Sequence, residues 1–276
     1  MLCEIKPFPF TKIAKNTKKN IEKGDYPMGG KFFLAGVVLV AVLAAMRAVA
    51  AEPDGDEIVA KVDAELYGNT GRYLADLTMI RPGEEPRTSR IQVYIKGTDK
   101  VLVRYLAPAR EKGMGYLRVG EDEWLYLPNA GRSIRVSGRQ NLQGTDLSND
   151  DVLKVHLALE YQARIAGEEE IEGAPCWVLE LAAREQSAAY GRLKYWVRKA
   201  DFLPARTEYY AFSGRLLKTM TYAEIKEIGG RVRPTRMVIE SGLREGYRTL
   251  FVILEADYRT PLGDNLFTRL YLEKGK

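Results

Sequence analysis

The chain has 276 residues, with 42 Lys and Arg against 37 Asp and Glu and a formal net charge of +5. Eight of the basic and three of the acidic residues lie within residues 1–50, so the remaining 226 residues hold 34 of each sign. A neutral body has no electrostatic footprint for polyanions, which excludes a general nucleic-acid-binding protein.

The first 50 residues have the pattern of a secretory leader. Lys31 precedes an apolar run from Phe32 to Met46, and the small residues Ala48-Val49-Ala50 follow. A basic residue, a short apolar core and an Ala-x-Ala site are the usual signal for export and cleavage. We therefore predict that residues 1–50 are an N-terminal extension with a cleaved signal and that residues 51–276 form a single domain.

Cleavage is expected after Ala50 or Ala51, and Met28 is an alternative start of the chain. The apolar run is shorter than the ~20 residues that span a bilayer, which favours cleavage over a retained anchor. Cleavage would remove Cys3 and leave Cys176 without a disulfide partner. No cysteine stands directly after the apolar run, where a lipid would be attached. These features predict a protein free in the periplasm of a bacterium with two membranes.

The first element of the domain is a predicted helix over residues 54–67. Ile58, Val59, Val62 and Leu66 recur at helical spacing, and Gly68 follows as a stop signal. The sequence therefore predicts one amphipathic helix at the start of the domain.

From residue 72 onward the hydrophobic period changes to alternation. Ile91, Val93 and Ile95, for example, alternate with more polar residues, as is typical of strands with one buried face. Short turns between consecutive strands demand antiparallel pairing. We therefore expect a mainly β fold with a few helices, whose large antiparallel sheet either closes into a barrel or curls around a helical cover. The predicted strands cover residues 72–80, 91–95, 101–105, 114–120, 174–182, 193–198, 204–212, 215–226, 232–240 and 247–257.

Residues 123–151 join three different patterns. An aromatic strand stops at Pro128, and a short turn leads to a basic strand around Ile134. Asx and Ser residues then precede the apolar run 152–157, so a helix is expected to begin near Ser148.

The basic cluster in this segment is open to two interpretations. It is either a solvated hairpin that pairs with the acidic turn or a surface that meets anionic headgroups or an acidic partner. Its members are Arg132, Arg135 and Arg139, and the acids of the turn are Asp146, Asp150 and Asp151.

The residues that usually carry catalysis are scarce. The sequence lacks a nucleophile elbow, a P-loop and a dinucleotide fingerprint. His156 is the single histidine and is expected to be a packing residue, while Cys176 is expected to be a buried, inert thiol. Glu168 to Glu170 read as a solvated bend between segments. We therefore predict no catalytic residue, no metal site, no cofactor and no enzymatic activity.

Aromatic and β-branched residues on the predicted strands are abundant instead. Core packing explains many of them, but together they suit an apolar interior that is wide enough for a flexible ligand. The candidate ligand-binding residues are Val93, Val103, Tyr105, Tyr116, Trp124, Tyr126, Tyr195, Tyr209, Tyr222 and Phe251.

Two blocks of the sequence resemble the outer-membrane lipoprotein-sorting family, whose members are similar to the periplasmic carrier LolA. The first block runs from Trp124-Leu125-Tyr126-Leu127-Pro128 to the acidic turn Gly144–Asp151, and the second runs from Tyr195 to Lys218. The residues of this chain that match the family's signature and the expected rim of its cavity are Arg132, Arg135, Gly144, Asp146, Ser148 and Asp151.

This resemblance implies an unclosed half-barrel of antiparallel strands covered by a helical lid. It also implies a non-enzymatic carrier that moves lipoprotein acyl chains or lipids from the inner to the outer membrane. The implied partners are an inner-membrane transporter, with the resistance-nodulation-division type as a candidate, and an outer-membrane acceptor. The alternative is a periplasmic adaptor or sensor that docks on the transporter and carries no free lipid.

Overall fold

The computed structural model describes residues 53–67, 69–153 and 156–275, which belong to one compact unit spanning residues 52–276. The predicted leader and its cleavage site lie outside the described residues. None of the helices in the described part combines the length and the apolar sequence that crossing a bilayer requires.

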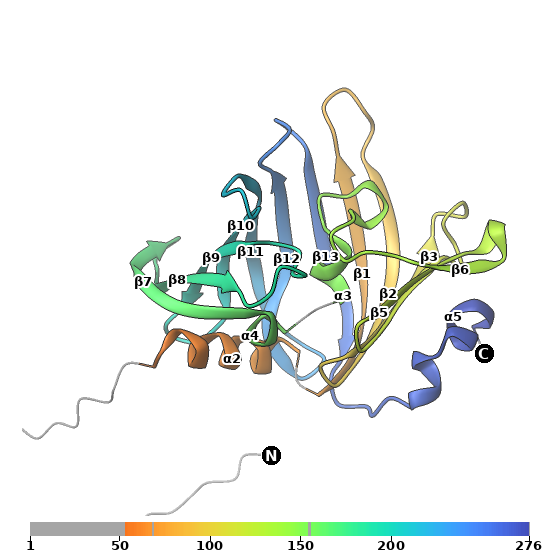
Figure 1. Cartoon of the computed structure of the whole chain (residues 1–276), viewed down its shortest axis with the longest axis horizontal. Helices are drawn as coiled ribbons and strands as arrows, with labels where there is room; N and C mark the ends of the chain where they lie inside the picture. The colour runs from red at the N-terminus through yellow and green to blue at the C-terminus, as the bar shows by residue number, and fades with distance from the viewer. Residues whose placement is uncertain (1–52, 68, 154–155, 276) are drawn as a thin grey trace, which may run out of the picture. The chain divides into compact units, whose positions relative to one another are not determined.

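Thirteen strands of the described residues form one antiparallel sheet in the order β6-β5-β4-β3-β2-β1-β13-β12-β11-β10-β9-β8-β7 (Figure 1). The two outermost strands, β6 and β7, do not pair with each other, so the sheet is not closed. The predicted curled antiparallel sheet is therefore confirmed. The strands are β1 (Thr70–Ile80), β2 (Arg87–Lys96), β3 (Lys100–Ala107), β4 (Gly115–Val119), β5 (Asp122–Leu127), β6 (Arg132–Arg135), β7 (Tyr161–Ile171), β8 (Ala174–Ala183), β9 (Arg192–Arg198), β10 (Pro204–Tyr210), β11 (Leu216–Ile228), β12 (Arg231–Ser241) and β13 (Arg248–Asp257).

The sheet consists of two meanders that meet in its centre. The chain runs outward from β1 to β6, crosses the inner face of the sheet, and returns inward from β7 to β13. The first and last strands then pair, with Leu77 opposite Phe251. The described residues 136–153 and 156–160 belong to the crossing, and the buried side chains of Leu142, Leu147 and Leu153 in it pack against the inner face.

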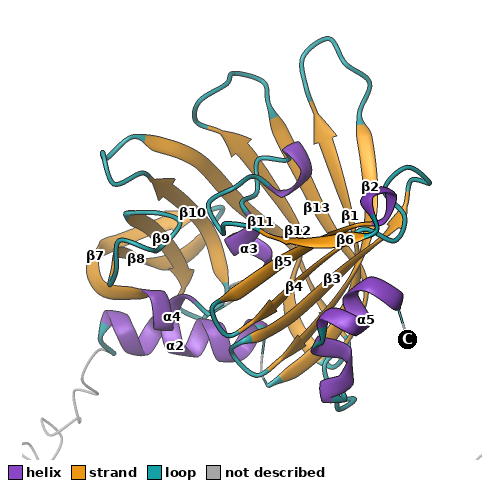
Figure 2. Cartoon of the chain, turned by 45° about the vertical axis from the view of Figure 1, so that its right-hand side comes forward, coloured by secondary structure: helices purple, strands orange, loops and turns teal. Residues whose placement is uncertain are grey.

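The helix α2 (Gly55–Leu66) matches the predicted first element. Asp54 caps it by accepting a hydrogen bond of 2.8 Å from the backbone N–H of Glu57, which satisfies one of the unpaired donors of the first turn. Ile58 and Val62 are completely buried. The helix lies against β7 and β12 and so covers one part of the inner face (Figure 2).

The helix predicted near Ser148 is present as two short pieces, α3 (Asn149–Leu153) and α4 (Leu157–Glu160). Ser148 and Asp151 cap α3 reciprocally. The Ser148 N–H donates to the Asp151 carboxylate over 2.6 Å, and the Asp151 N–H donates to the Ser148 hydroxyl over 3.3 Å. This capping box is the reason that the acidic turn ends in a helix. Residue His156 stands in extended backbone at the start of α4.

The sheet buries apolar side chains on both faces. The main core lies on the inner face, between the strands and α2, α3 and α4. A smaller core lies on the outer face, where Phe267 of the 3-10 turn η3 (Asp264–Phe267) and Leu272 of α5 (Arg269–Lys274) pack on Leu102 and Leu117. Two further 3-10 turns, η1 (Pro128–Ala130) and η2 (Leu142–Gly144), lie between β5 and α3.

One local prediction is wrong. Glu168 to Glu170 do not form a bend but lie within β7, where each pairs in register with a residue of β8. These side chains are exposed because β7 is an edge strand with little cover on that stretch. The run of acids does not show the alternating apolar face by which a strand is predicted. Backbone pairing with β8 stabilises this stretch instead.

Candidate functional site

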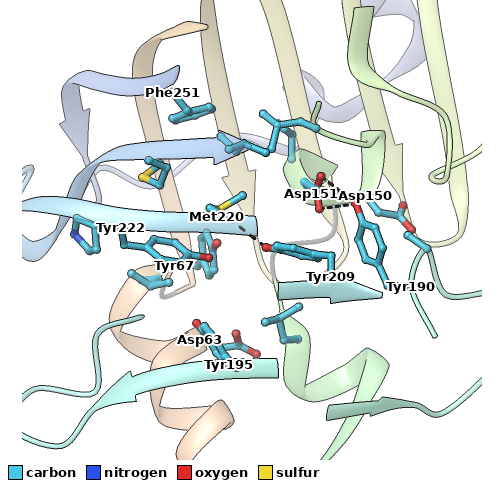
Figure 3. A pocket seen from close by; sticks show the side chains of 18 of the residues that line it. Asp63, Tyr67, Asp150, Asp151, Tyr190, Tyr195, Tyr209, Met220, Tyr222 and Phe251 are labelled. Atoms are coloured by element: carbon cyan, nitrogen blue, oxygen red, sulfur yellow. Dashed lines mark hydrogen bonds between the residues drawn. The ribbon is translucent and has the colours of Figure 1, made fainter. Parts of the chain in front are cut away.

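A cavity of about 110 Å³ lies between the inner face of the sheet and the helices α2, α3 and α4. Strands β9 to β13 form its floor, together with β1 and β7 (Figure 3). Its aromatic lining is dense because six strands contribute one aromatic side chain each and two more come from outside the strands. These aromatic residues are Tyr67, Tyr73, Tyr161, Tyr190, Tyr195, Tyr209, Tyr222 and Phe251.

The structure divides the ten predicted ligand-binding residues into three groups. Four of them line the cavity: Tyr195, Tyr209, Tyr222 and Phe251.

Four others belong to the same inner core but pack elsewhere in it, on β2, β3 and β4: Val93, Val103, Tyr105 and Tyr116. Trp124 and Tyr126 are turned to the outer face, where they pack with the cluster around α5. These two side chains do not line the cavity, because alternation along β5 directs Leu125 inward and its neighbours outward.

Methionines contribute flexible lining that sequence reasoning did not single out. Met220 of β11 and Met237 of β12 both face the cavity, and Met220 Sδ lies 3.9 Å from the Tyr209 hydroxyl. Thioether side chains adapt their shape at low cost. The sequence offered one signal for Met220. It lies two residues before Tyr222 on β11, so both side chains point to the same face of the sheet.

All the tyrosines of the lining that lie deep in the molecule stay protonated. Burial raises the pKa of Tyr195, Tyr209 and Tyr222, since the phenolate would lose its hydration. The cavity therefore offers neutral rings and hydroxyls to a ligand.

Asp63 is the acidic group of α2 that lines the cavity. It is 5% exposed, and its Oδ2 accepts a hydrogen bond of 2.9 Å from the N–H of Ala158 in α4. Burial raises the pKa of Asp63 to about 7, although backbone hydrogen bonds from Ala158 and Leu157 oppose the shift. The carboxyl group thus joins two helices of the cover and titrates near neutral pH.

A buried ion pair stands at the other end of the cavity. Lys218 of β11 pairs with Asp151 of α3, and both side chains are 4% exposed. The Tyr190 hydroxyl lies 2.9 Å from Ser148 Oγ and 3.0 Å from Asp151 Oδ1. Burial lowers the pKa of Lys218, and the Asp151 carboxylate opposes that shift. This pair joins the two sequence blocks of the resemblance, since Asp151 closes the first and Lys218 the second.

Arginines of the sheet hold the cover in place. Arg233 donates to the Leu66 carbonyl over 2.9 Å, and Arg231 donates to the Ala64 carbonyl over 2.7 Å, so both bind the C-terminal end of α2. Arg118 of β4 donates to the Leu153 carbonyl over 3.3 Å at the end of α3. Positive charge at these ends is favourable because the unpaired carbonyls of a helix point there.

The predicted signature residues serve mainly as scaffold. Gly144 has a φ of +78°, a backbone conformation that favours glycine. Its carbonyl accepts a hydrogen bond of 2.7 Å from the Arg81 guanidinium. Asp146 lies 3.2 Å from Arg244 rather than near the basic hairpin. Arg135 pairs with Asp122 and stacks on Trp124, while Arg132 is exposed at the sheet edge. The expected pairing between the hairpin and Asp146 or Asp151 is therefore replaced by partners on β11 and the β12–β13 turn.

Metal ligands do not gather in the described residues: no group of three or more His, Cys, Asp or Glu side chains is found there. Cys176 is buried on the outer face of β8, where burial raises the pKa of its thiol. His156 lies edge-on to Tyr67 with a ring separation of 5.7 Å, and burial lowers its pKa.

Comparison with known proteins gives a consistent result. A family model described as an uncharacterized protein matches residues 97–274. None of the curated proteins matches the chain. Among solved structures, a LolA superfamily protein from Nitrosomonas europaea is 29% identical with a TM-score of 0.73, and the match covers 79% of this chain and 99% of that one.

Two further structures are similar. A DUF1329 family protein from Desulfovibrio piger is 27% identical with a TM-score of 0.73, over 79% of this chain and 97% of the other. A domain described as an outer membrane lipoprotein-sorting protein, from Vibrio parahaemolyticus, is 23% identical with a TM-score of 0.70, over 80% and 98%. The last likeness concerns the fold alone.

Proposed function

Since this chain belongs to the LolA-like, outer-membrane lipoprotein-sorting family, we propose that it is a non-enzymatic periplasmic carrier of acyl chains. It takes up the chains of lipoproteins or lipids at an inner-membrane transporter and delivers them to an acceptor in the outer membrane. The secretory pattern of residues 1–50 supports a periplasmic location.

The observation that carries this proposal is the apolar cavity under a cover of short helices. Eight aromatic residues and two methionines line it, and α2, α3 and α4 contribute to its walls. An interior of this kind suits a flexible apolar ligand better than a rigid polar one.

Simple energetics show why a carrier is needed. Exposure of each methylene to water costs about 0.8 kcal/mol, so a chain of ~16 carbons costs roughly 12 kcal/mol in open periplasm. Contact with the lining of the cavity removes most of this cost. Release stays possible because methionines and tyrosines adapt to the chain without a tight fit.

The cavity must widen to take up a whole acyl chain. Its volume of about 110 Å³ is below the ~300–1,000 Å³ of pockets that enclose drug-sized ligands. The cover is held by apolar packing, such as that of Ile58 and Val62, and by polar contacts of Arg233 and Arg118 with helix ends. Each hydrogen bond from a charged group contributes about 1.5–3 kcal/mol net, and burial of the acyl chain must offset the contacts that opening breaks.

The first experiment measures cargo directly. Protein purified from an exporting host is analysed by native mass spectrometry, and uptake of a fluorescent fatty acid is titrated. We expect co-purified lipid, or saturable uptake of the probe with a ratio of one site per chain.

A plug variant supplies the matched comparison. Ala189 lines the cavity, so Ala189→Trp should reduce uptake of the probe at least tenfold, whereas Ala182→Trp at an exposed position of β8 should not. Absence of both co-purified lipid and probe uptake in the unmodified protein would falsify the carrier proposal.

The small volume of the cavity also favours a second candidate. An adaptor or sensor that docks on a transporter without lipid cargo needs no more room than the side chains already fill. The same titration decides between the two, because the adaptor predicts that neither Ala189→Trp nor Ala182→Trp changes anything measurable with the fatty acid.

A further inference from the structure

A second cavity of about 350 Å³ adjoins the first on the far side of Tyr190. The segment 139–148 covers it, and strands β11 and β12 form its floor. Its walls carry fewer aromatic side chains than those of the first cavity, together with several charged and hydrogen-bonding groups. Those that matter here are Arg139, Asp146, Ser148, Lys218 and Arg244.

The charge of this polar cleft is positive on balance. Three cationic side chains line it, Arg139, Lys218 and Arg244, against one carboxylate, Asp146. Arg244 lies 3.2 Å from that carboxylate, and Lys218 pairs with Asp151 on the side of the apolar cavity. The hydrogen bonds recorded for Arg139 in the described residues reach main-chain carbonyls, that of Ala188 over 3.0 Å and that of Gln186. Carbonyl partners hold the guanidinium in place without cancelling its charge.

The two cavities share a wall. Ala189 and Tyr190 line both, and the hydroxyl of Tyr190 belongs to the network of Ser148, Asp151 and Lys218. A molecule with an apolar tail in the first cavity therefore meets cations directly beyond this wall. The mouth of the cleft also carries apolar surface, since Leu243 is 50% exposed there and Phe212, 45% exposed, lies under the Arg139 guanidinium.

We propose that the polar cleft binds the phosphate group of an anionic lipid whose acyl chain occupies the apolar cavity. This assignment rests on the proposed carrier function for the tail, and it narrows the cargo to amphiphiles with a phosphate head.

Guanidinium groups suit such a head because their planar donors pair with two phosphate oxygens at once. A volume of 350 Å³ also accommodates a head group together with its ordered water. The Arg244 guanidinium is 45% exposed and can turn to the ligand, while the Asp146 carboxylate, which is 9% exposed, keeps its hydrogen bond of 3.2 Å from the Thr249 hydroxyl.

The test compares two short-chain lipids with identical tails, dihexanoyl phosphatidic acid and dihexanoyl glycerol, by calorimetric titration at low and moderate salt. Inorganic phosphate is the third probe. The variants are Arg139→Gln, Arg244→Gln and the double substitution. Arg110→Gln is the control, because Arg110 is exposed in the β3–β4 turn and lines neither cavity.

We expect the unmodified protein to bind the phosphatidic acid at least tenfold more tightly than the glycerol, with a preference that declines as salt is added. The double variant should lose this preference while its affinity for the glycerol stays the same. Arg110→Gln should retain the preference. Inorganic phosphate should compete with the charged lipid only at millimolar concentration, because it lacks the tail.

The contrary results are equally distinct. Equal affinity for the two lipids, or a preference that survives in the double variant, would overturn the phosphate assignment and leave the carrier intact. Inorganic phosphate that binds as tightly as the lipid, without displacing it, would make the cleft a site for free anions. Absence of binding by either lipid would instead contradict the carrier function itself.

Discussion

The two halves of the sheet share one pattern but enclose different interiors. In the half formed by β1 to β6, the inner face is filled, and Val93 and Val103 are completely buried in the inner core. In the half formed by β7 to β13, the inner face carries tyrosines and methionines, and a cavity remains under α2 and α4. The difference shows that alternation builds the face, while side-chain size and the position of the cover decide whether it is filled.

The halves also differ in polarity. The buried ion pair of Lys218 with Asp151 and the polar cleft beside it lie over β11 and β12. In the first half, by contrast, the buried Arg118 donates hydrogen bonds to the main-chain carbonyls of Gly120 and Leu153. Under the proposed function, one half would maintain the fold and the other would meet the ligand.

The largest expected effect concerns the buried pair. Lys218→Met leaves the Asp151 carboxylate without its cation at a site that is 4% exposed, so the free energy of unfolding should fall by about 3–5 kcal/mol. Chemical denaturation followed by circular dichroism measures it. Arg90→Met breaks the exposed pair with Asp76 and should leave the free energy of unfolding nearly unchanged. If Lys218→Met lowers the free energy of unfolding by less than about 1 kcal/mol, the buried pair does not distinguish the two halves energetically.

The second prediction compares a filled with a cavity-lining position. Ile91→Ala, in the filled half, should cost about 4 kcal/mol because the residue is completely buried and close-packed. Met237→Ala, at the cavity, should cost only about 1 kcal/mol, since its side chain is half-buried and already borders empty space. Equal losses in denaturant melts would show that both halves are filled alike. Uptake of the fluorescent fatty acid should change in Met237→Ala alone.

The third prediction is a pH dependence that belongs to the cavity half. The folded pKa of Asp63 is about 7 against an ordinary value of 3.8, so the folded state binds a proton that the unfolded state does not bind between these values. The free energy of unfolding should therefore rise as pH falls, by about 1.4 kcal/mol from pH 8 to pH 6.

Urea denaturation at a series of pH values checks this slope. Asp63→Asn should remove this part of the pH dependence of the free energy of unfolding, because the amide does not titrate. Glu65→Gln, on the exposed side of the same helix, should leave the slope as it is. A slope that persists unchanged in Asp63→Asn would assign it to another group.

The smallest effect is expected on the outer face. Trp124→Ala should reduce the free energy of unfolding by about 1 kcal/mol, mainly through lost stacking with Arg269 and Arg135. It should leave the dissociation constant of the fatty acid unchanged, whereas Tyr209→Ala inside the cavity should change it at least threefold. A change of similar size in Trp124→Ala would place ligand on the outer face as well.

Much of the fold could be predicted because it follows from local patterns. The alternation of β2, the spacing of Ile58 and Val62 in α2, and the capping residues Ser148 and Asp151 each specify their element with few long-range contacts. The strand β7 escaped prediction because its stretch of glutamates shows no buried face. Its stability comes from β8, which a local pattern does not reveal.

The candidate site could be predicted only in part, for a related reason. Alternation assigns a residue to a face, but the choice of face as inner or outer depends on what covers it. Trp124 and Leu125 illustrate the difficulty, because α5 from the distant C-terminus covers one and the inner core buries the other. Sequence patterns did not predict three residues of the cavity walls, because their environments arise from separate segments that meet only in the folded chain. These residues are Asp63, Tyr190 and Lys218.

The pairing of β1 with β13 has a consequence for the order of events in the life of the chain. The central seam of the sheet joins strands separated by almost the whole folded unit. A growing chain holds β1 as an unpaired edge until Arg248 to Asp257 have been made, and such distant contacts form slowly. Completion of the last strand closes the seam, and the floor of the cavity is assembled at that same moment.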